Sequence, residues 1–180
     1  MKKRCLFIVF LILLISLPVS AQWETSVSKD EMEGTEMWFA TSPSVSPTQE
    51  MDFPYHNIKA WIGIGFDGED EWVYVGFNES PNVGFNESPN ITDTSLQDGY
   101  ELIETRTKWD DEIKDITLSH DWGSKFIHFR DADAVINNII NSDTVLLELK
   151  WFGEGEVYFR FPLKSAASAI VEAREAVDNE

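Results

Sequence analysis

The chain has 180 residues, of which 43% are hydrophobic and 13% aromatic, and its 32 acidic and 14 basic side chains give a formal net charge of −18. This apolar content is sufficient for a folded core and excludes a disordered chain. The negative charge argues against a nucleic-acid-binding protein, because phosphate backbones require a basic surface. The single cysteine, Cys5, excludes an intrachain disulfide bond and a cysteine-based zinc site.

The first 21 residues have the order of a secretory signal peptide. A basic start, Met1–Arg4, precedes an apolar run over residues 5–17, and small residues then precede a cleavage position after Ala21. The apolar run is shorter than the roughly 20 residues that a membrane-spanning helix needs, so a retained anchor is the weaker interpretation. We therefore expect a periplasmic or secreted protein with no stable membrane anchor after cleavage, one domain over residues 22–177, and a frayed tail at 178–180.

Apolar and polar residues alternate with a period of two through much of the chain. Such alternation is typical of strands with at least one buried face. Gly153-Glu154-Gly155 separates the last two of these runs and predicts a short hairpin. The five runs cover residues 58–66, 72–77, 116–120, 145–151 and 157–161.

Two further stretches have apolar residues at helical spacing. The first covers residues 132–140, with Asp131 as its predicted N-cap, and the second covers residues 165–177, with Ser165 as its predicted N-cap. Together these elements predict a mainly β protein, an antiparallel, jelly-roll-like β-sandwich with one short helix between late strands and another at the C-terminus.

Two segments are predicted to be loops. Residues 41–54 contain three prolines and several serines, which favour a loop or an irregular sheet edge. An octapeptide occurs twice in tandem, as GFNESPNV at 76–83 and GFNESPNI at 84–91. We interpret it as a duplication that lengthened a surface loop, because loop closure becomes only slowly more costly with length.

Three acidic clusters, at residues 30–33, 67–71 and 110–112, are candidate calcium sites. Calcium takes six to eight oxygen ligands, which alternating carboxylates in a loop can supply. The best candidates are Asp67, Glu69, Asp70 and Glu71, between two predicted strands, but they lack the spacing of an EF-hand loop. An acidic hairpin loop is the interpretation that we favour, and no other cofactor is expected.

Local signatures of catalysis are absent from the sequence. It contains no G-x-S-x-G elbow and no H-E-x-x-H helix, and the three histidines, His56, His120 and His128, stand outside such motifs. We therefore predict a protein without enzymatic activity. The alternative is a hydrolase of cell-wall polymers or glycans that uses a carboxylate pair, assisted by His120, because such pairs meet in space rather than in sequence.

The candidate binding residues are aromatic and acidic side chains at two strand ends. The seven tryptophans are expected to be mostly buried, and Trp109 and Trp122, which are nearest to predicted loops, are the candidates for exposure. If the two strands pair, we expect their tips to meet on one rim and form a cleft for a cation or a sugar. The alternative is two polar hairpin ends. The residues concerned are Trp109, Asp110 and Asp111 at one end and His120, Asp121 and Trp122 at the other.

Several short motifs occur in an order that suggests a family. Trp23-Glu24-Thr25-Ser26 follows the signal and precedes an acidic turn at 28–34, and ETRTKWD at 104–110, SHDWGSKF at 119–126 and VYFRFPLKSA at 157–166 come later. This order resembles the TagO/VasI-like proteins associated with type VI secretion, and its outline is also similar to periplasmic proteins of the invasion-associated locus B type. The middle and C-terminal cysteines usual in those families are missing, and Ser165 replaces a glycine.

The resemblance implies a non-enzymatic β-sandwich protein of the cell envelope. It would act as a binding or accessory protein, with an envelope protein or a glycan as its partner.

Overall fold

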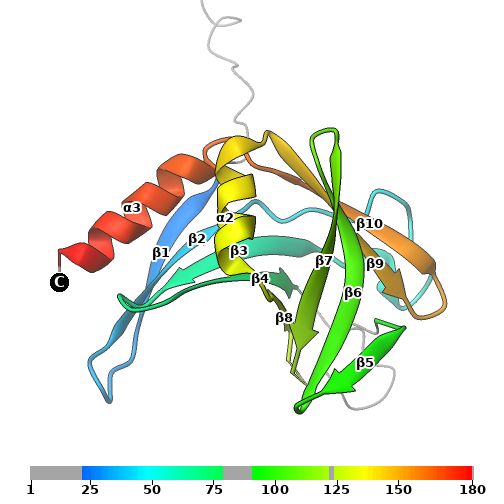
Figure 1. The fold of residues 1–180 in the computed structure, drawn as a ribbon, viewed down its shortest axis with the longest axis horizontal. Helices are drawn as coiled ribbons and strands as arrows, with labels where there is room; N and C mark the ends of the chain where they lie inside the picture. The colour runs from blue at the N-terminus through cyan, green and yellow to red at the C-terminus, as the bar shows by residue number, and fades with distance from the viewer. Residues whose placement is uncertain (1–21, 79–90, 122–123, 180) are drawn as a thin grey trace, which may run out of the picture.

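The computed structural model describes residues 22–78, 91–121 and 124–179. Ten strands form one antiparallel sheet, and two α-helices and one 3₁₀ turn, η1 (Tyr55–Asn57), complete the described part (Figure 1). The strands are β1 (Glu24–Lys29), β2 (Glu36–Thr41), β3 (Ala60–Phe66), β4 (Glu71–Phe77), β5 (Thr94–Gln97), β6 (Tyr100–Trp109), β7 (Glu112–His120), β8 (Phe126–Phe129), β9 (Thr144–Trp151) and β10 (Gly155–Pro162). The helices are α2 (Ala132–Asn141) and α3 (Ala166–Asp178).

The sheet is folded over so that its two halves face each other. Its strand order is β1-β2-β3-β4-β8-β7-β6-β9-β10, and β5 pairs with β6. The segment after β2 connects β3 with β10, the last strand of this order, because Val45 bridges to Ala60 on β3 and Pro47 bridges to Phe159 on β10. This arrangement confirms the predicted mainly β, sandwich-like fold with two short helices. The predicted loop at 41–54 is therefore an irregular segment with two isolated bridges.

The inward side chains of the two halves form one apolar core. Ile62 and Ile64 on β3 and Leu147 and Leu149 on β9 are at most 1% exposed, as the alternation in their strands predicts. The β9–β10 hairpin is also confirmed, with Trp151 paired to Gly155.

The two helices begin in different ways. Asp131 is the N-cap of α2, as predicted, because its Oδ1 accepts a hydrogen bond of 3.1 Å from the backbone N–H of Ala134. Ser165 occupies the N-cap position of α3, as predicted, but it has φ 70° and its side chain makes no capping hydrogen bond. Its Oγ instead accepts a hydrogen bond of 3.1 Å from the backbone N–H of Trp23. The start of β1 is thereby fastened to the start of α3.

Helix α3 covers β1 and β2 on the core side of the sheet (Figure 1). Arg174 anchors it through two hydrogen bonds of 2.7 Å to the carboxylate of Glu71 on β4. The helix includes Asp178, which was predicted to belong to the frayed tail. No helix in the described part of the chain is long and apolar enough to span a membrane. The repeated octapeptide lies outside the described residues, apart from its first three residues and Ile91.

Candidate functional site

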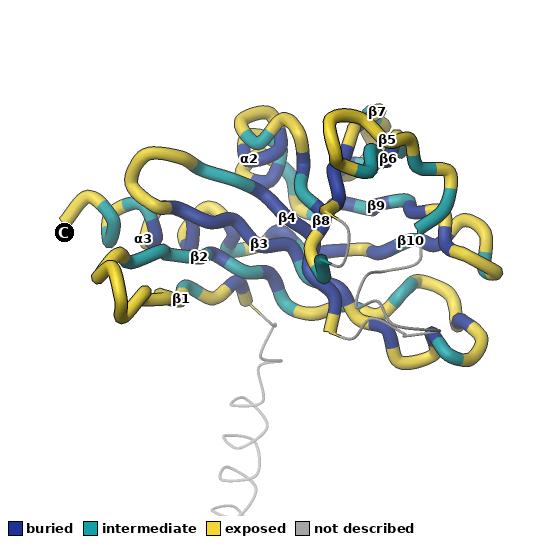
Figure 2. The backbone as a smooth tube through the Cα atoms, turned by 90° about the horizontal axis from the view of Figure 1, so that it is seen from below, coloured by how far each residue is buried: buried dark blue, intermediate teal, exposed yellow. Residues whose placement is uncertain are grey.

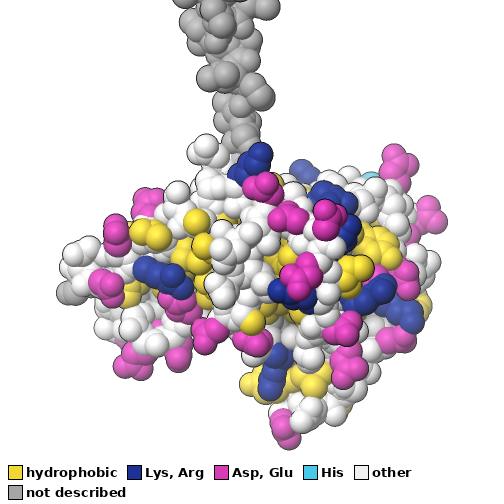
Figure 3. All heavy atoms as spheres, turned by 45° about the horizontal axis from the view of Figure 1, so that its top comes forward, with side chains coloured by type: hydrophobic (Ala, Val, Ile, Leu, Met, Phe, Trp, Pro, Cys, Tyr) yellow, Lys and Arg dark blue, Asp and Glu magenta, His cyan; other side chains and the backbone are white. Residues whose placement is uncertain are grey.

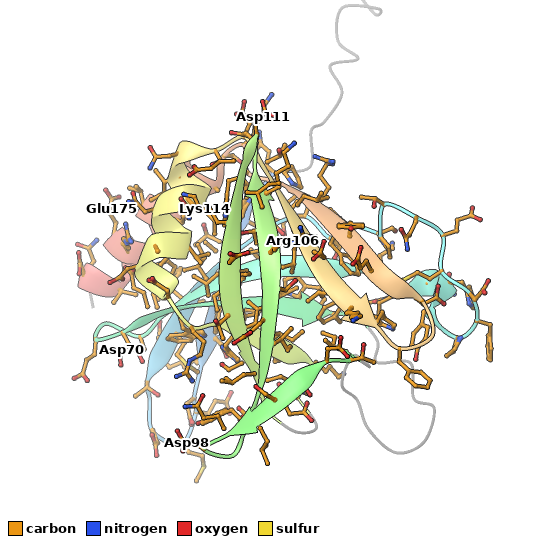
Figure 4. The ribbon with its side chains drawn as sticks, turned by 45° about the vertical axis from the view of Figure 1, so that its right-hand side comes forward. Asp70, Asp98, Arg106, Asp111, Lys114 and Glu175 are labelled. Carbon is orange, nitrogen blue, oxygen red and sulfur yellow. The ribbon has the colours of Figure 1, made fainter. Side chains whose placement is uncertain are left out.

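The predicted rim does not form, because β6 and β7 are the two arms of one hairpin. Trp109 pairs with Glu112 at the turn, whereas Glu101 pairs with His120 at the open end. Strand β7 has nine residues, so at ~3.3 Å per residue its two ends lie about 26 Å apart. Figure 4 shows Asp111 at one end of this hairpin and Asp98, just before β6, at the other. The prediction that the two clusters share a cleft is therefore wrong.

The structure also gives Trp109 a buried position. This side chain is 3% exposed, and its indole Nε1 donates a hydrogen bond of 2.9 Å to Thr107 Oγ1. Both side chains lie on the face of β6 that points to the core, and Thr107 is 1% exposed. The expectation that Trp109 is exposed is thus wrong, and Trp122 lies outside the described residues.

Asp110 holds the turn of the β6–β7 hairpin against the start of β9. Its backbone adopts φ 46°, a left-handed conformation that Asp tolerates better than most residues. Its carboxylate accepts hydrogen bonds from the backbone N–H groups of Asp143, at 3.1 Å, and Thr144, at 2.9 Å. These donors keep the pKa of Asp110 below its usual value.

The lowered pKa of Asp110 predicts a pH-dependent effect of Asp110→Asn. A carboxyl group whose pKa is lower in the folded state adds stability above its unfolded pKa of about 3.9, and this stability is lost as the pH falls through the folded pKa. Asn keeps the left-handed turn but removes the charge. Thermal melts at pH 7 should therefore show a lower Tm for Asp110→Asn than for the wild type, and the difference should shrink at pH 3.

The matched control is Asp111→Asn, which changes the neighbouring carboxylate at the same turn. The Asp111 side chain is fully exposed and lies 3.4 Å from Lys108 Nζ, and exposed pairs of this kind contribute little. Its Tm should match the wild type at both pH values. A Tm difference for Asp110→Asn that is the same at pH 7 and pH 3 would contradict the role of the charge.

His120 has a fixed position beneath the surface. It is 5% exposed, its Nδ1 lies 3.1 Å from Glu101 Oε2, and its Nε2 lies 3.0 Å from the carbonyl oxygen of Ser124. These contacts connect the open end of the β6–β7 hairpin to the segment that precedes β8. Asp121, the next residue, is exposed.

Two carboxylates of the acidic loop between β3 and β4 already accept hydrogen bonds from other groups of the protein. Asp67 Oδ1 accepts hydrogen bonds from the backbone N–H groups of Glu69, at 3.0 Å, and Asp70, at 2.7 Å. Glu71 pairs with Arg174 on α3. Within the described ranges, no group of three or more His, Cys, Asp or Glu side chains is arranged to hold a metal ion. Calcium binding at these residues stays a prediction.

A polar cleft of about 820 Å³ lies between the β6–β7 hairpin and α2. Two of its basic side chains are already engaged, since Arg106 Nε donates to Glu148 Oε1 at 3.0 Å and Lys114 Nζ donates to Asn138 Oδ1 at 2.9 Å. The hydrogen bond from Arg106 lowers the pKa of Glu148. Basic and acidic side chains are interspersed on the neighbouring surface (Figure 3). The cleft therefore offers no concentration of one charge to an incoming ligand.

A different surface gathers aromatic side chains on the outer side of the sheet. We call it the aromatic face, and it spans the strands β2, β3, β4 and β8, seen from below in Figure 2. Part of it forms an open groove of about 390 Å³, whose polar lining residues include Ser26 and Thr41. The aromatic face comprises Phe39, Trp61, Trp72, Tyr74, Phe126 and His128.

Three of these rings lie over glycines of the neighbouring strand. Gly63 pairs with Tyr74, and Gly65 pairs with Trp72. A Cβ atom added to Gly63 would lie 2.2 Å from Tyr74 Cζ, and one added to Gly65 would lie 2.3 Å from Trp72 Cε2. Trp61 covers Gly76 in the same way. An aromatic ring over a glycine shields the backbone and is held close to the sheet.

The remaining contacts fix the rings against one another. Tyr74 meets Phe126 edge to face, with ring centroids 5.1 Å apart, and Phe39 meets Trp72 in the same way at 6.2 Å. Burial raises the pKa of the Tyr74 phenol and lowers the pKa of His128, although the nearby Asp121 carboxylate opposes the second shift. The Tyr74 and His128 side chains are therefore neutral at pH 7, which leaves the groove aromatic and uncharged.

The sequence contained a signal for this surface that a count of tryptophans misses. In WIGIGF (61–66) and WVYVGF (72–77), the side of each strand that does not face the core carries only glycines and aromatic residues. Once the two strands pair as a hairpin, each glycine stands opposite an aromatic residue. Trp61 and Trp72 are thus partly exposed on this face, whereas Trp109 is buried.

Comparisons with known proteins give no match to a family model, to a curated protein or to a solved structure.

Proposed function

We propose that this protein is a non-enzymatic binding protein of the cell envelope and that its aromatic face binds a neutral glycan. The observation that carries the proposal is the set of rings held over Gly63, Gly65 and Gly76. Fixed rings lose little conformational entropy on binding and present apolar surface to the carbon-bound hydrogens of a sugar. Ser26 and Thr41, beside the rings, supply hydroxyl groups for hydrogen bonds.

Charge supports a neutral ligand over an anionic one. The whole chain carries a formal charge of −18, which opposes the approach of an anionic polymer. The described groove is lined by Ser26, Thr41 and aromatic side chains, without a Lys or Arg to attract an anion. Binding would therefore depend on stacking and shape more than on salt concentration.

The expected secretory signal at residues 1–21 supports a place in the cell envelope. The resemblance to TagO/VasI-like proteins points the same way, and a connection with a secretion apparatus rests on that resemblance alone. A second candidate, a hydrolase that acts on wall polymers, gains no support from the aromatic face, whose groove lining contains no carboxylate.

Binding of N-acetylglucosamine oligomers tests the proposal. We expect titration of chitohexaose to change the intrinsic tryptophan fluorescence of the wild-type protein in a saturable way. Removing a stacking ring with Trp72→Ala should weaken the binding by about tenfold or more, equivalent to ~1.4 kcal/mol. The matched control is Phe152→Ala, which removes an exposed aromatic ring in the β9–β10 turn, outside the aromatic face. It should bind as the wild type does.

The same experiment separates binding from catalysis. Incubation with the oligomer should release no shorter product. Saturable binding without turnover would support the proposal, whereas turnover would favour the hydrolase. Equal affinities of Trp72→Ala and the wild type, or the absence of binding at millimolar concentrations to a panel that also includes cello- and malto-oligosaccharides, would overturn the aromatic face as a glycan site.

A further inference from the structure

Two exposed phenylalanines flank a second groove at the other side of the fold. Phe53 precedes η1 and is 86% exposed, and Phe152 stands in the β9–β10 turn and is 63% exposed. They line a groove of about 640 Å³ together with Tyr55 and Ile91. We call it the two-phenylalanine groove. It shares no lining residue with the groove of the aromatic face, so it constitutes an independent surface.

The two loops that form this groove are fastened to each other, although about 100 residues separate them. The backbone N–H of Asp52 donates a hydrogen bond of 2.9 Å to Glu154 Oε1. The Phe53 ring stacks on His56, with centroids 6.1 Å apart. Beneath them, Tyr55 packs edge to face against the buried Trp151 at 5.5 Å. The two loops and the Phe53 ring are therefore held in place before any partner arrives, which lowers the entropic cost of binding.

The charges of the groove indicate which partner it fits. Its described lining contains the carboxylates of Asp52 and Glu154 and neither Lys nor Arg. Carboxylates beside exposed aromatic rings suit a cation, because the ring face and the carboxylate both attract it. Apolar side chains next to that cation would cover Phe53 and Phe152.

Two other occupants are less favourable on electrostatic grounds. An anionic lipid surface would be repelled by the two carboxylates and by the formal net charge of −18. A second copy of this chain would carry the same charge and meet the same repulsion. We propose that the two-phenylalanine groove docks a basic peptide segment of another protein, in which Lys or Arg alternates with apolar residues.

Fluorescence anisotropy with labelled peptides tests this proposal. The probe is a hexapeptide of alternating Arg and Leu, and the two reference peptides replace Arg with Glu or Leu with Ser. The wild-type protein should bind the Arg-Leu probe at least about tenfold more tightly than either reference, since both the cation and the apolar residue contribute. Full-length mature protein is used throughout, and circular dichroism verifies that each variant is folded.

Two pairs of variants separate the groove from the general acidity of the protein. Phe53→Ala with Phe152→Ala removes the rings, and its control is Ile113→Ala, which removes a side chain of similar exposure, 62%, at the tip of the β6–β7 hairpin. Asp52→Asn with Glu154→Gln removes the charges but keeps an oxygen to accept the Asp52 N–H. Its control is Glu31→Gln with Glu33→Gln in the β1–β2 loop, on the opposite side of the molecule (Figure 1).

We expect each groove variant to lose at least about tenfold in affinity and each control to bind like the wild type. Equal losses in the two charge variants would show non-specific attraction and overturn the proposal. Binding of the Glu-Leu peptide at equal affinity would also overturn it. Failure of the Arg-Leu probe to bind would overturn the proposal if the two phenylalanines are instead required for binding to phosphatidylcholine vesicles. It would likewise be overturned if the probe fails and the two phenylalanines are required for self-association.

Discussion

Replacement of Trp151 with alanine is expected to lower the free energy of unfolding by about 3–5 kcal/mol, the range for removal of a large aromatic side chain from a core. Trp151 is 1% exposed and lies where β9, β4 and β10 meet the segment around η1. Its indole contacts the rings of Phe77, at 5.7 Å, and Phe159, at 6.3 Å, as well as Tyr55. The alanine variant leaves a cavity that these rings, held by their own strands, cannot fill.

The conservative variant Trp151→Phe should behave differently. The Trp151 Nε1 is buried, and within the described residues no hydrogen-bond acceptor faces it. Phe removes this unpaired donor, and the ~1–3 kcal/mol that such a group costs offsets much of the lost volume. We expect Trp151→Phe to change the stability by less than about 1.5 kcal/mol. Urea denaturation followed by circular dichroism measures both values, and equal losses in the two variants would contradict this account of the core.

The strands that the sequence predicted are those with a conventional alternation. In β9 and β10 one face enters the core and the other meets solvent, so the apolar residues recur at every second position. Strand β2 lacks this pattern because both of its faces carry apolar side chains: Trp38 and Ala40 lie under α3, and Phe39 belongs to the aromatic face. The core positions of β6 are hard to recognise in the sequence for a different reason: the polar residue Thr107 is buried at one of them.

The binding surface was harder to predict because it depends on which strands are neighbours. The predicted rim assumed that the C-terminal ends of two strands lie side by side, but β6 and β7 run in opposite directions around a two-residue turn at Asp110 and Asp111. The aromatic face also combines Phe126 and His128 with β4, and that pairing joins segments about 50 residues apart. Only the pairs within the β3–β4 hairpin, Gly63–Tyr74, Gly65–Trp72 and Trp61–Gly76, are local enough to be read from the sequence of one hairpin.

Those glycine pairs lead to the second large effect, expected for Gly63→Ala. Ala normally stabilises a strand relative to Gly by ~0.5–1 kcal/mol, because Gly loses more conformational freedom on folding. Here the new Cβ would lie 2.2 Å from Tyr74 Cζ, and Tyr74, which is 9% exposed, is confined by Phe126 and His128. The clash should cost about 1–3 kcal/mol and outweigh the gain. Displacement of the Tyr74 ring should also weaken chitohexaose binding if the proposed glycan site is correct.

The effect of Gly63→Ala on the free energy of unfolding should change sign when the Tyr74 ring is absent. The three atoms nearest to the added Cβ all belong to Tyr74, so a Tyr74→Ala background relieves the clash, and Gly63→Ala should there stabilise the protein by ~0.5–1 kcal/mol, as for an ordinary strand glycine. Gly65→Ala offers a comparison, because its clashing partner Trp72 is partly exposed and can move outward at lower cost. Urea denaturation of the four variants of the Gly63–Tyr74 cycle measures the coupling. A Gly63→Ala effect of the same sign and size in both backgrounds would mean that Tyr74 is not held against the glycine, and the aromatic face would lose its physical basis.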